Sequence, residues 1–192
     1  MTDAVLYTAQ QQVVLDTIER EGVSRVKLAY IDKKYGDTAW SFREAYSFFR
    51  ETASGILPRP EEAESAIWLF PDSRWCFMGP DSLLMTFRIP RDQVLFFDQR
   101  VWNRILNLEY IGKDPADEAR FAAELKNIGL DSTHKLFSTS FYPLQKRKVR
   151  DSWKRLFSSA EGCPESYLQA AVWELRKEWL IEVRSAAAHA SV

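Results

Sequence analysis

Residues that hold metal ions or form disulfides are scarce in this chain. Its 192 residues include two histidines and two cysteines, and Cys76 and Cys163 lie too far apart in sequence for a typical metal site. The G-x-S-x-G, P-loop and G-x-G-x-x-G motifs are absent too, which disfavours a classical hydrolase and leaves a glycine-loop nucleotide site unsupported. We therefore expect no metal and two free thiols, the usual state in a reducing cytoplasm.

Long apolar runs and an excess of one charge are also missing. No apolar run approaches the roughly 20 residues that span a bilayer, and the first residues lack the basic and apolar regions of a signal peptide. The formal net charge is −1, so the protein has no overall positive charge that would attract nucleic acid or an anionic membrane. These absences predict a cytoplasmic protein with no membrane partner.

Aromatic residues are plentiful, at 14% of the chain with seven tryptophans. The length favours one globular domain, which we place at residues 1–185, followed by a disordered tail at residues 186–192. Short apolar runs bounded by Gly, Pro and Asp predict strands. The expected strands lie near residues 5–8, 66–70, 83–89, 94–97 and 169–175, with a half-buried strand through Val26, Leu28 and Tyr30.

Helix signals fall between these strands. Gly22 ends a helix that follows the first strand, and Ser41 with Glu44 forms an S-x-x-E capping box at the start of another. The Asp114-Pro115 pair starts a third helix, whereas residues 131–142 have no periodicity and predict a loop around His134. The sequence thus predicts an α+β domain, with a small mixed or antiparallel sheet and flanking helices.

The segment at residues 167–184 leaves two interpretations open. Leu168, Val172 and Leu175 have the spacing of a helical stripe, which favours a helix. Gln169, Ala171 and Trp173 would instead share one face of a strand, with a second strand returning over residues 179–183.

Pro143 starts a helix with a strongly basic side. Its cations are Lys146, Arg147, Lys148, Arg150, Lys154 and Arg155. Such a helix could bind phosphates, or its cations could be a solvated face that balances acids elsewhere. In either case we expect the cations at the surface and Trp153 in the core.

Polar and aromatic residues near strand ends and on one helix are the candidate site residues. Thr8 and Gln10 close the first strand, Asp98 ends the fourth, and Tyr46 lies on the helix that follows the capping box. Each has a structural alternative: local hydrogen bonding for Thr8 and Gln10, helix capping for Asp98, and core packing for Tyr46.

Several short sequences occur in an order that resembles a known family. They are LYTAQ near the start, Ala45-Tyr46, RIPRDQVLFFDQRVWNRILN, Ser152-Trp153 and QAAVWEL. The ordered set is similar to a bacterial and phage family known only as a domain of unknown function, and it covers roughly Val5 to Arg184. That resemblance implies little chemistry.

A second resemblance is to the ADP-ribosyltransferase-like fold. LYTAQ is similar to the first strand of that fold, and Gln169 in QAAVWEL stands where many members have a catalytic Glu on a strand. The resemblance implies NAD as cofactor, with Thr8 and Gln10 against the nicotinamide ribose, Tyr46 stacked on the ring and Asp98 bordering the site. It gives catalytic positions to Gln169 and Tyr46. Thr8 replaces the His or Arg of the family, and Gln169 brings no negative charge to stabilise an oxocarbenium-like centre.

Two functions therefore remain open. One is an NAD-binding, ADP-ribosyltransferase-like enzyme that modifies a protein or nucleic acid in phage–host conflict. If this is right, Thr8, Gln10, Tyr46 and Gln169 should meet in one cleft. The other is a non-catalytic module that holds a protein or nucleic acid with exposed aromatic residues and the basic helix at residues 143–157.

Overall fold

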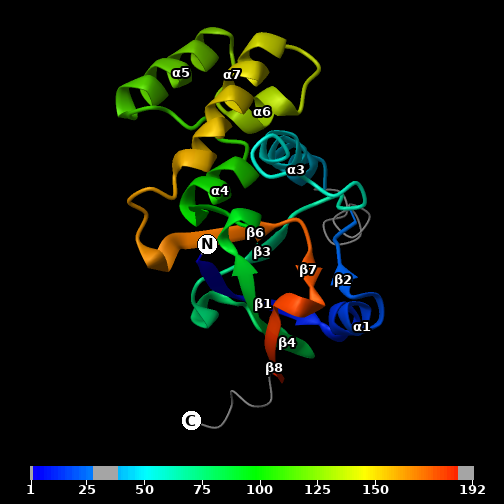
Figure 1. Cartoon of the computed structure of the whole chain (residues 1–192). Coiled ribbons are helices and arrows are strands. Elements are labelled where there is room, and N and C mark those ends of the chain that lie inside the picture. Colours follow the sequence, from blue (N-terminus) through cyan, green and yellow to red (C-terminus); the bar gives the residue numbers. More distant parts are fainter. Residues whose placement is uncertain (1, 28–38, 186–192) are drawn as a thin grey trace.

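The computed structural model describes residues 2–27 and 39–185, and its strands form small antiparallel sheets beneath a group of helices (Figure 1). The first sheet has the order β1 (Asp3–Gln11), β4 (Ser82–Pro90), β8 (Leu180–Ser185). The second has the order β3 (Ile67–Leu69), β6 (Leu168–Val172), β5 (Leu95–Asp98). The short strands β2 (Val23–Ser24) and β7 (Leu175–Arg176) form a separate ribbon. The expected α+β fold is thereby confirmed, and strands lie near all five predicted positions, although the one expected at residues 169–175 is divided between β6 and β7.

Most helices gather at one end of the molecule, whereas α1 lies beside the sheets (Figure 1). The α-helices are α1 (Gln12–Glu21), α3 (Ala39–Ala53), α4 (Gln99–Leu106), α5 (Pro115–Asn127), α6 (Thr133–Phe137) and α7 (Pro143–Trp153). Short 3-10 turns are η2 (Ser73–Trp75), η3 (Arg91–Gln93), η4 (Lys154–Ser158), η5 (Glu165–Tyr167) and η6 (Lys177–Trp179). Within the described ranges, no helix is long and apolar enough to cross a membrane.

Two apolar clusters lie on opposite faces of the second sheet. One fills the space between the two sheets and contains Leu6, Phe87 and Val172. The other lies between the second sheet and the helices and contains Ala171 and Trp173. Because successive strand side chains point to opposite faces, β6 is buried on both sides.

This double burial resolves the two interpretations of residues 167–184. A helix would need one apolar stripe, but Ala170 and Ala171 enter different clusters, as alternate strand positions do. The interpretation as strands is therefore confirmed for β6. The returning strand β8 pairs with β4 in the other sheet, where Leu84 lies opposite Arg184.

The ribbon of β2 and β7 is closed by an ion cluster around one buried carboxylate. Glu174 is 5% exposed, and its carboxylate accepts hydrogen bonds from Arg25 at 2.8 Å and Arg176 at 2.7 Å. The segment after α1 is thus attached to the strand before β8. Removing the carboxylate would take the shared anion from both guanidinium groups and leave only the longer pairs Arg25–Glu62 at 3.8 Å and Arg176–Glu178 at 3.5 Å.

Some sequence predictions need correction. Helix α3 begins at Ala39, so Ser41 lies inside its first turn and does not start the helix, and the Glu44 carboxylate accepts from Arg150 at 3.0 Å. Helix α6 replaces part of the expected loop, because Ser132 caps it by accepting from the backbone N–H of Lys135 at 3.3 Å. The strand expected through Leu28 and Tyr30, and the tail at residues 186–192, fall outside the described residues.

Candidate functional site

The most unusual polar group in the core is the side chain of Gln169. It lies on β6 opposite Phe97 of β5 and is 6% exposed. Its Oε1 atom is buried and has no hydrogen-bond partner in the part of the chain that the structure describes. A buried amide oxygen without a partner costs about 1–3 kcal/mol, so this atom is the first place to look for a ligand.

Aromatic rings extend from Gln169 along the same face of the second sheet. Phe97 lies opposite Gln169, and its ring centroid is 6.4 Å from that of Trp102. The Trp102 ring lies 5.0 Å from Trp68 and 5.7 Å from Tyr46. The Nε1 atom of Trp68 donates to the Tyr46 hydroxyl at 3.3 Å. Tyr46 and Gln169 therefore belong to the same side of the sheet.

Two residues that the sequence analysis did not single out, Tyr7 and Phe70, lie on neighbouring strands next to Gln169. The backbones of Tyr7 and Phe70 exchange two hydrogen bonds of 2.8 Å, which join β1 to the end of β3. Leu69 pairs with Ala170, so the antiparallel register puts Phe70 beside Gln169. The side chains of Tyr7 and Phe70 are half-buried. Burial alternates along β1, with Ala4 and Leu6 buried, so Tyr7 faces the other way. The sequence carries no such signal, because residues 4–7 are all apolar or aromatic.

Thr8 and Gln10 lie on the opposite face from Gln169. Leu6, two residues before Thr8, enters the cluster between the sheets, and Thr8 itself is 3% exposed. Gln10 Nε2 donates to Thr8 Oγ1 at 2.9 Å, which is the local bond expected as the structural alternative. The four predicted residues thus form two pairs, Thr8 with Gln10 and Tyr46 with Gln169, on different faces.

Asp98 acts as the cap of α4. Its carboxylate accepts from the Arg100 backbone N–H at 2.8 Å and pairs with the Arg100 guanidinium at 2.6 Å. Burial disfavours the charged form, but the hydrogen bonds from Arg100 outweigh it and hold the pKa of Asp98 below 3.8. Arg100 in turn lies 4.2 Å over the Tyr167 ring. By strand alternation from Phe97, Asp98 projects away from the Gln169 side.

The basic helix lies at the surface as predicted, and Trp153 is fully buried. Most of its cations have partners inside the protein, because Arg150 pairs with Glu44 and Glu51 on α3 at 3.0 Å. Lys148 also pairs with Glu124 on α5 at 2.7 Å. A groove of about 490 Å³ follows the boundary between α3 and α7. Two cations of α7, Lys148 and Arg150, therefore connect this helix to α5 and α3.

Comparison with known proteins identifies a family. A family model described as Domain of unknown function (DUF3841) matches residues 5–181. No curated protein matches the chain, and no solved structure matches it.

Proposed function

The chain belongs to the family described as Domain of unknown function (DUF3841), and we propose that it binds NAD on the Gln169 face of its second sheet. The proposal follows the resemblance of its sequence to ADP-ribosyltransferase-like proteins. The observation that carries it is the buried Gln169 Oε1 atom, which has no partner among the described residues. A hydrogen-bond donor from a ligand would remove that penalty.

The residues around Gln169 suit the chemistry of NAD. Ribose hydroxyls and the nicotinamide carboxamide are donors that an amide oxygen can accept. Half-buried aromatic rings at Tyr46, Tyr7 and Phe70 offer surfaces on which a flat heterocycle can stack. Bound NAD would supply an activated ADP-ribosyl group, for transfer to a protein or a nucleic acid in phage–host conflict. Because Gln169 is neutral, its role would be to orient the ribose, and turnover would be slow.

Calorimetry with NAD tests this proposal directly. Wild-type protein should bind NAD, and Gln169→Ala and Tyr46→Ala should each weaken binding by about tenfold or more, as loss of one hydrogen bond or one ring contact implies. Gln10→Ala is the matched control, because it removes an amide from the opposite face and should leave binding unchanged. No binding at millimolar NAD would refute the proposal, and so would equal losses in all three variants.

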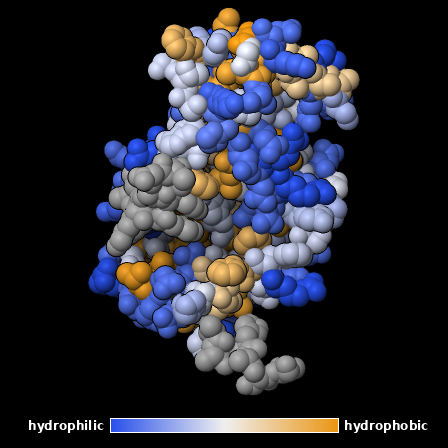
Figure 2. Space-filling model, turned by 180° about the vertical axis from the view of Figure 1, so that it is seen from behind, coloured by the Kyte–Doolittle hydropathy of each residue, from blue (hydrophilic) through white to orange (hydrophobic). Residues whose placement is uncertain are grey.

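A second candidate function is the non-catalytic interaction module. Phe141 and Leu144, beside the start of α7, are 72% and 67% exposed. Figure 2 shows hydrophobic surface at the end of the molecule where α5, α6 and α7 lie. If α7 binds nucleic acid there, affinity for a single-stranded oligonucleotide should fall steeply between 50 and 200 mM salt, because phosphate contacts release counterions. A flat salt response would exclude this function for α7.

A further inference from the structure

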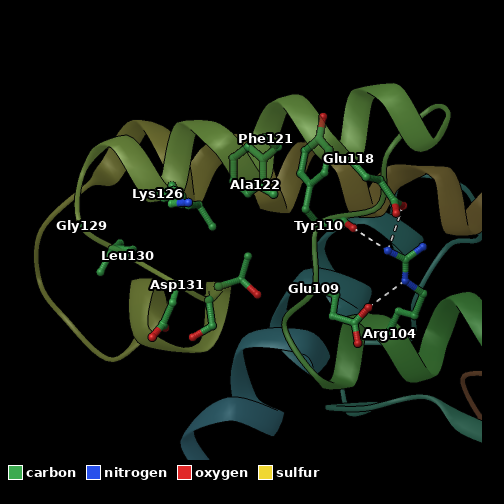
Figure 3. Close-up of a pocket in the computed structure, with 13 residues that line it drawn as sticks. Arg104, Glu109, Tyr110, Glu118, Phe121, Ala122, Lys126, Gly129, Leu130 and Asp131 are labelled. Carbon is green, nitrogen blue, oxygen red and sulfur yellow. Dashed lines mark hydrogen bonds and ion pairs between the residues drawn. The ribbon is translucent and has the colours of Figure 1, made fainter.

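A separate cavity of about 640 Å³ lies between α5, α6 and the end of α4 (Figure 3). Its floor is apolar and includes the side chains of Phe121, Leu125 and Leu130. The Tyr110 ring stacks on Phe121 with 4.2 Å between centroids and forms one wall. The volume suits a small organic molecule, since ligand cavities commonly measure about 300–1,000 Å³.

One end of this cavity carries more negative than positive charge. Arg104 Nε donates to Glu109 at 2.8 Å, and Arg104 Nη2 donates to Glu118 at 2.9 Å. Figure 3 shows both carboxylates turned toward this single guanidinium. Two carboxylates share one cation, so the group has a formal charge of −1. Its acids are 46% and 40% exposed, which leaves them within reach of a ligand.

The other end of the cavity has different charges. Lys126 lines it and carries a positive charge, and Asp131 there pairs with Lys135 at 2.6 Å. The hydroxyl groups of Ser132 and Thr133 complete this end. A cationic ligand would therefore place its charge at the Arg104 end of the cavity, close to the Glu109 and Glu118 carboxylates. An anionic ligand at that end would be repelled by the two carboxylates.

We propose that this cavity binds an organic cation, specifically a primary ammonium group attached to a compact apolar or aromatic body. The ammonium would donate hydrogen bonds to the Glu109 and Glu118 carboxylates and balance their excess negative charge, and the apolar body would cover the floor around Phe121. Aromatic rings also attract cations through their faces. The proposal is independent of NAD binding, because the cavity shares no residue with the Gln169 face.

Benzylammonium and its neutral counterpart, benzyl alcohol, test the proposal. We expect benzylammonium to bind the full chain with a dissociation constant on the order of 1 mM, as its small size allows, and benzyl alcohol to bind at least ~5-fold more weakly. Backbone amide shifts in two-dimensional NMR would locate the ligand, through Tyr110, Gly129 and Leu130, which line the cavity.

Three variants distinguish binding in this cavity from non-specific attraction of the amine to acidic residues elsewhere. Glu109→Gln should weaken benzylammonium binding about 5-fold while leaving Glu118 to bond the Gly112 N–H. Ala122→Phe fills the cavity from an exposed helix position and should abolish binding. Glu161→Gln removes the same charge from an exposed site outside the cavity and should change nothing. Equal binding of the amine and the alcohol, shifts that map elsewhere, or no shifts at about 10 mM amine would overturn the proposal.

Discussion

Replacing Gln169 by Met should stabilise the protein. Methionine has nearly the same length and shape as glutamine but no polar amide, so it can occupy the same space between Phe97 and Ala171 on the face of β6. The wild-type side chain buries an amide oxygen without a partner among the described residues. Proteins seldom keep such a group without a functional reason.

The expected gain follows from the penalty that the substitution removes. An unsatisfied buried acceptor costs about 1–3 kcal/mol, and glutamine and methionine lose similar side-chain entropy on burial, so that cost changes little. We expect a net gain of about 1–2 kcal/mol in the free energy of unfolding. For a domain of this size, that corresponds to a rise in Tm of about 2–8 °C.

Urea unfolding followed by tryptophan fluorescence measures the change, with the slope of the transition compared between variants. Gln169→Glu is the control, because a carboxylate buried at that position should lower stability at pH 7 by about 2 kcal/mol or more. A loss above about 1 kcal/mol in Gln169→Met would refute the reasoning, since it would mean that the amide is well satisfied. If Gln169→Met is more stable but no longer binds NAD, the wild-type protein keeps a destabilising glutamine at this position because NAD binding requires it.

Other buried groups should also respond in measurable ways. Burial opposes ionisation of Asp98, but hydrogen bonds from the neighbouring Arg100 lower its pKa. The Asp98 carboxylate therefore stabilises the protein above pH 3.8, and this stabilisation is lost as the pH falls through the pKa of Asp98 in the folded protein. Asp98→Ala should therefore cost about 1–2 kcal/mol in urea unfolding at pH 7, and a difference from wild type that stays constant into strong acid would contradict this. Burial raises the pKa of the Cys76 thiol to about 12, so an aromatic disulfide reagent at pH 8 should label Cys163 first and Cys76 only on unfolding; equal rates would be inconsistent with the structure. Glu174→Leu should lower the free energy of unfolding by about 2–4 kcal/mol, because two arginines lose their buried anion, and a change below about 0.5 kcal/mol would show that the cluster is dispensable.

Local signals in the sequence determined where most helices begin and end. Gly22 takes the left-handed conformation with φ of 78° that ends α1, because glycine has no Cβ to clash there. The Asp114 side chain accepts from the backbone N–H of Asp117 at 2.7 Å and starts α5 before Pro115. These effects depend on a few neighbouring residues, so the sequence alone was enough to predict them.

The position of the candidate site could be predicted only in part. The sequence placed Tyr46 on a helix, but its periodicity favoured a helix at Gln169 as well, and only the resemblance to the ADP-ribosyltransferase-like fold placed Gln169 on a strand. In the structure both side chains reach the same side of the second sheet. The sequence analysis also grouped Thr8 with them, whereas Tyr7 is the residue of β1 on that side. A strand position one residue away points to the opposite face, so an error of one residue exchanges the two faces.

Tertiary structure alone decided which elements meet. β8 lies beside β4 rather than returning along β6, and Arg150 of the basic helix pairs with Glu44, which is 106 residues away. The same holds for the cavity at Arg104, where α4 and α5 bring Glu118 to the guanidinium. Charge and apolar periodicity predict which face of a segment is charged and which is apolar, but they do not predict which distant segment packs against that face. The physical reason is that pairing between strands and between charges depends on register and packing over the whole chain, which short-range patterns do not contain.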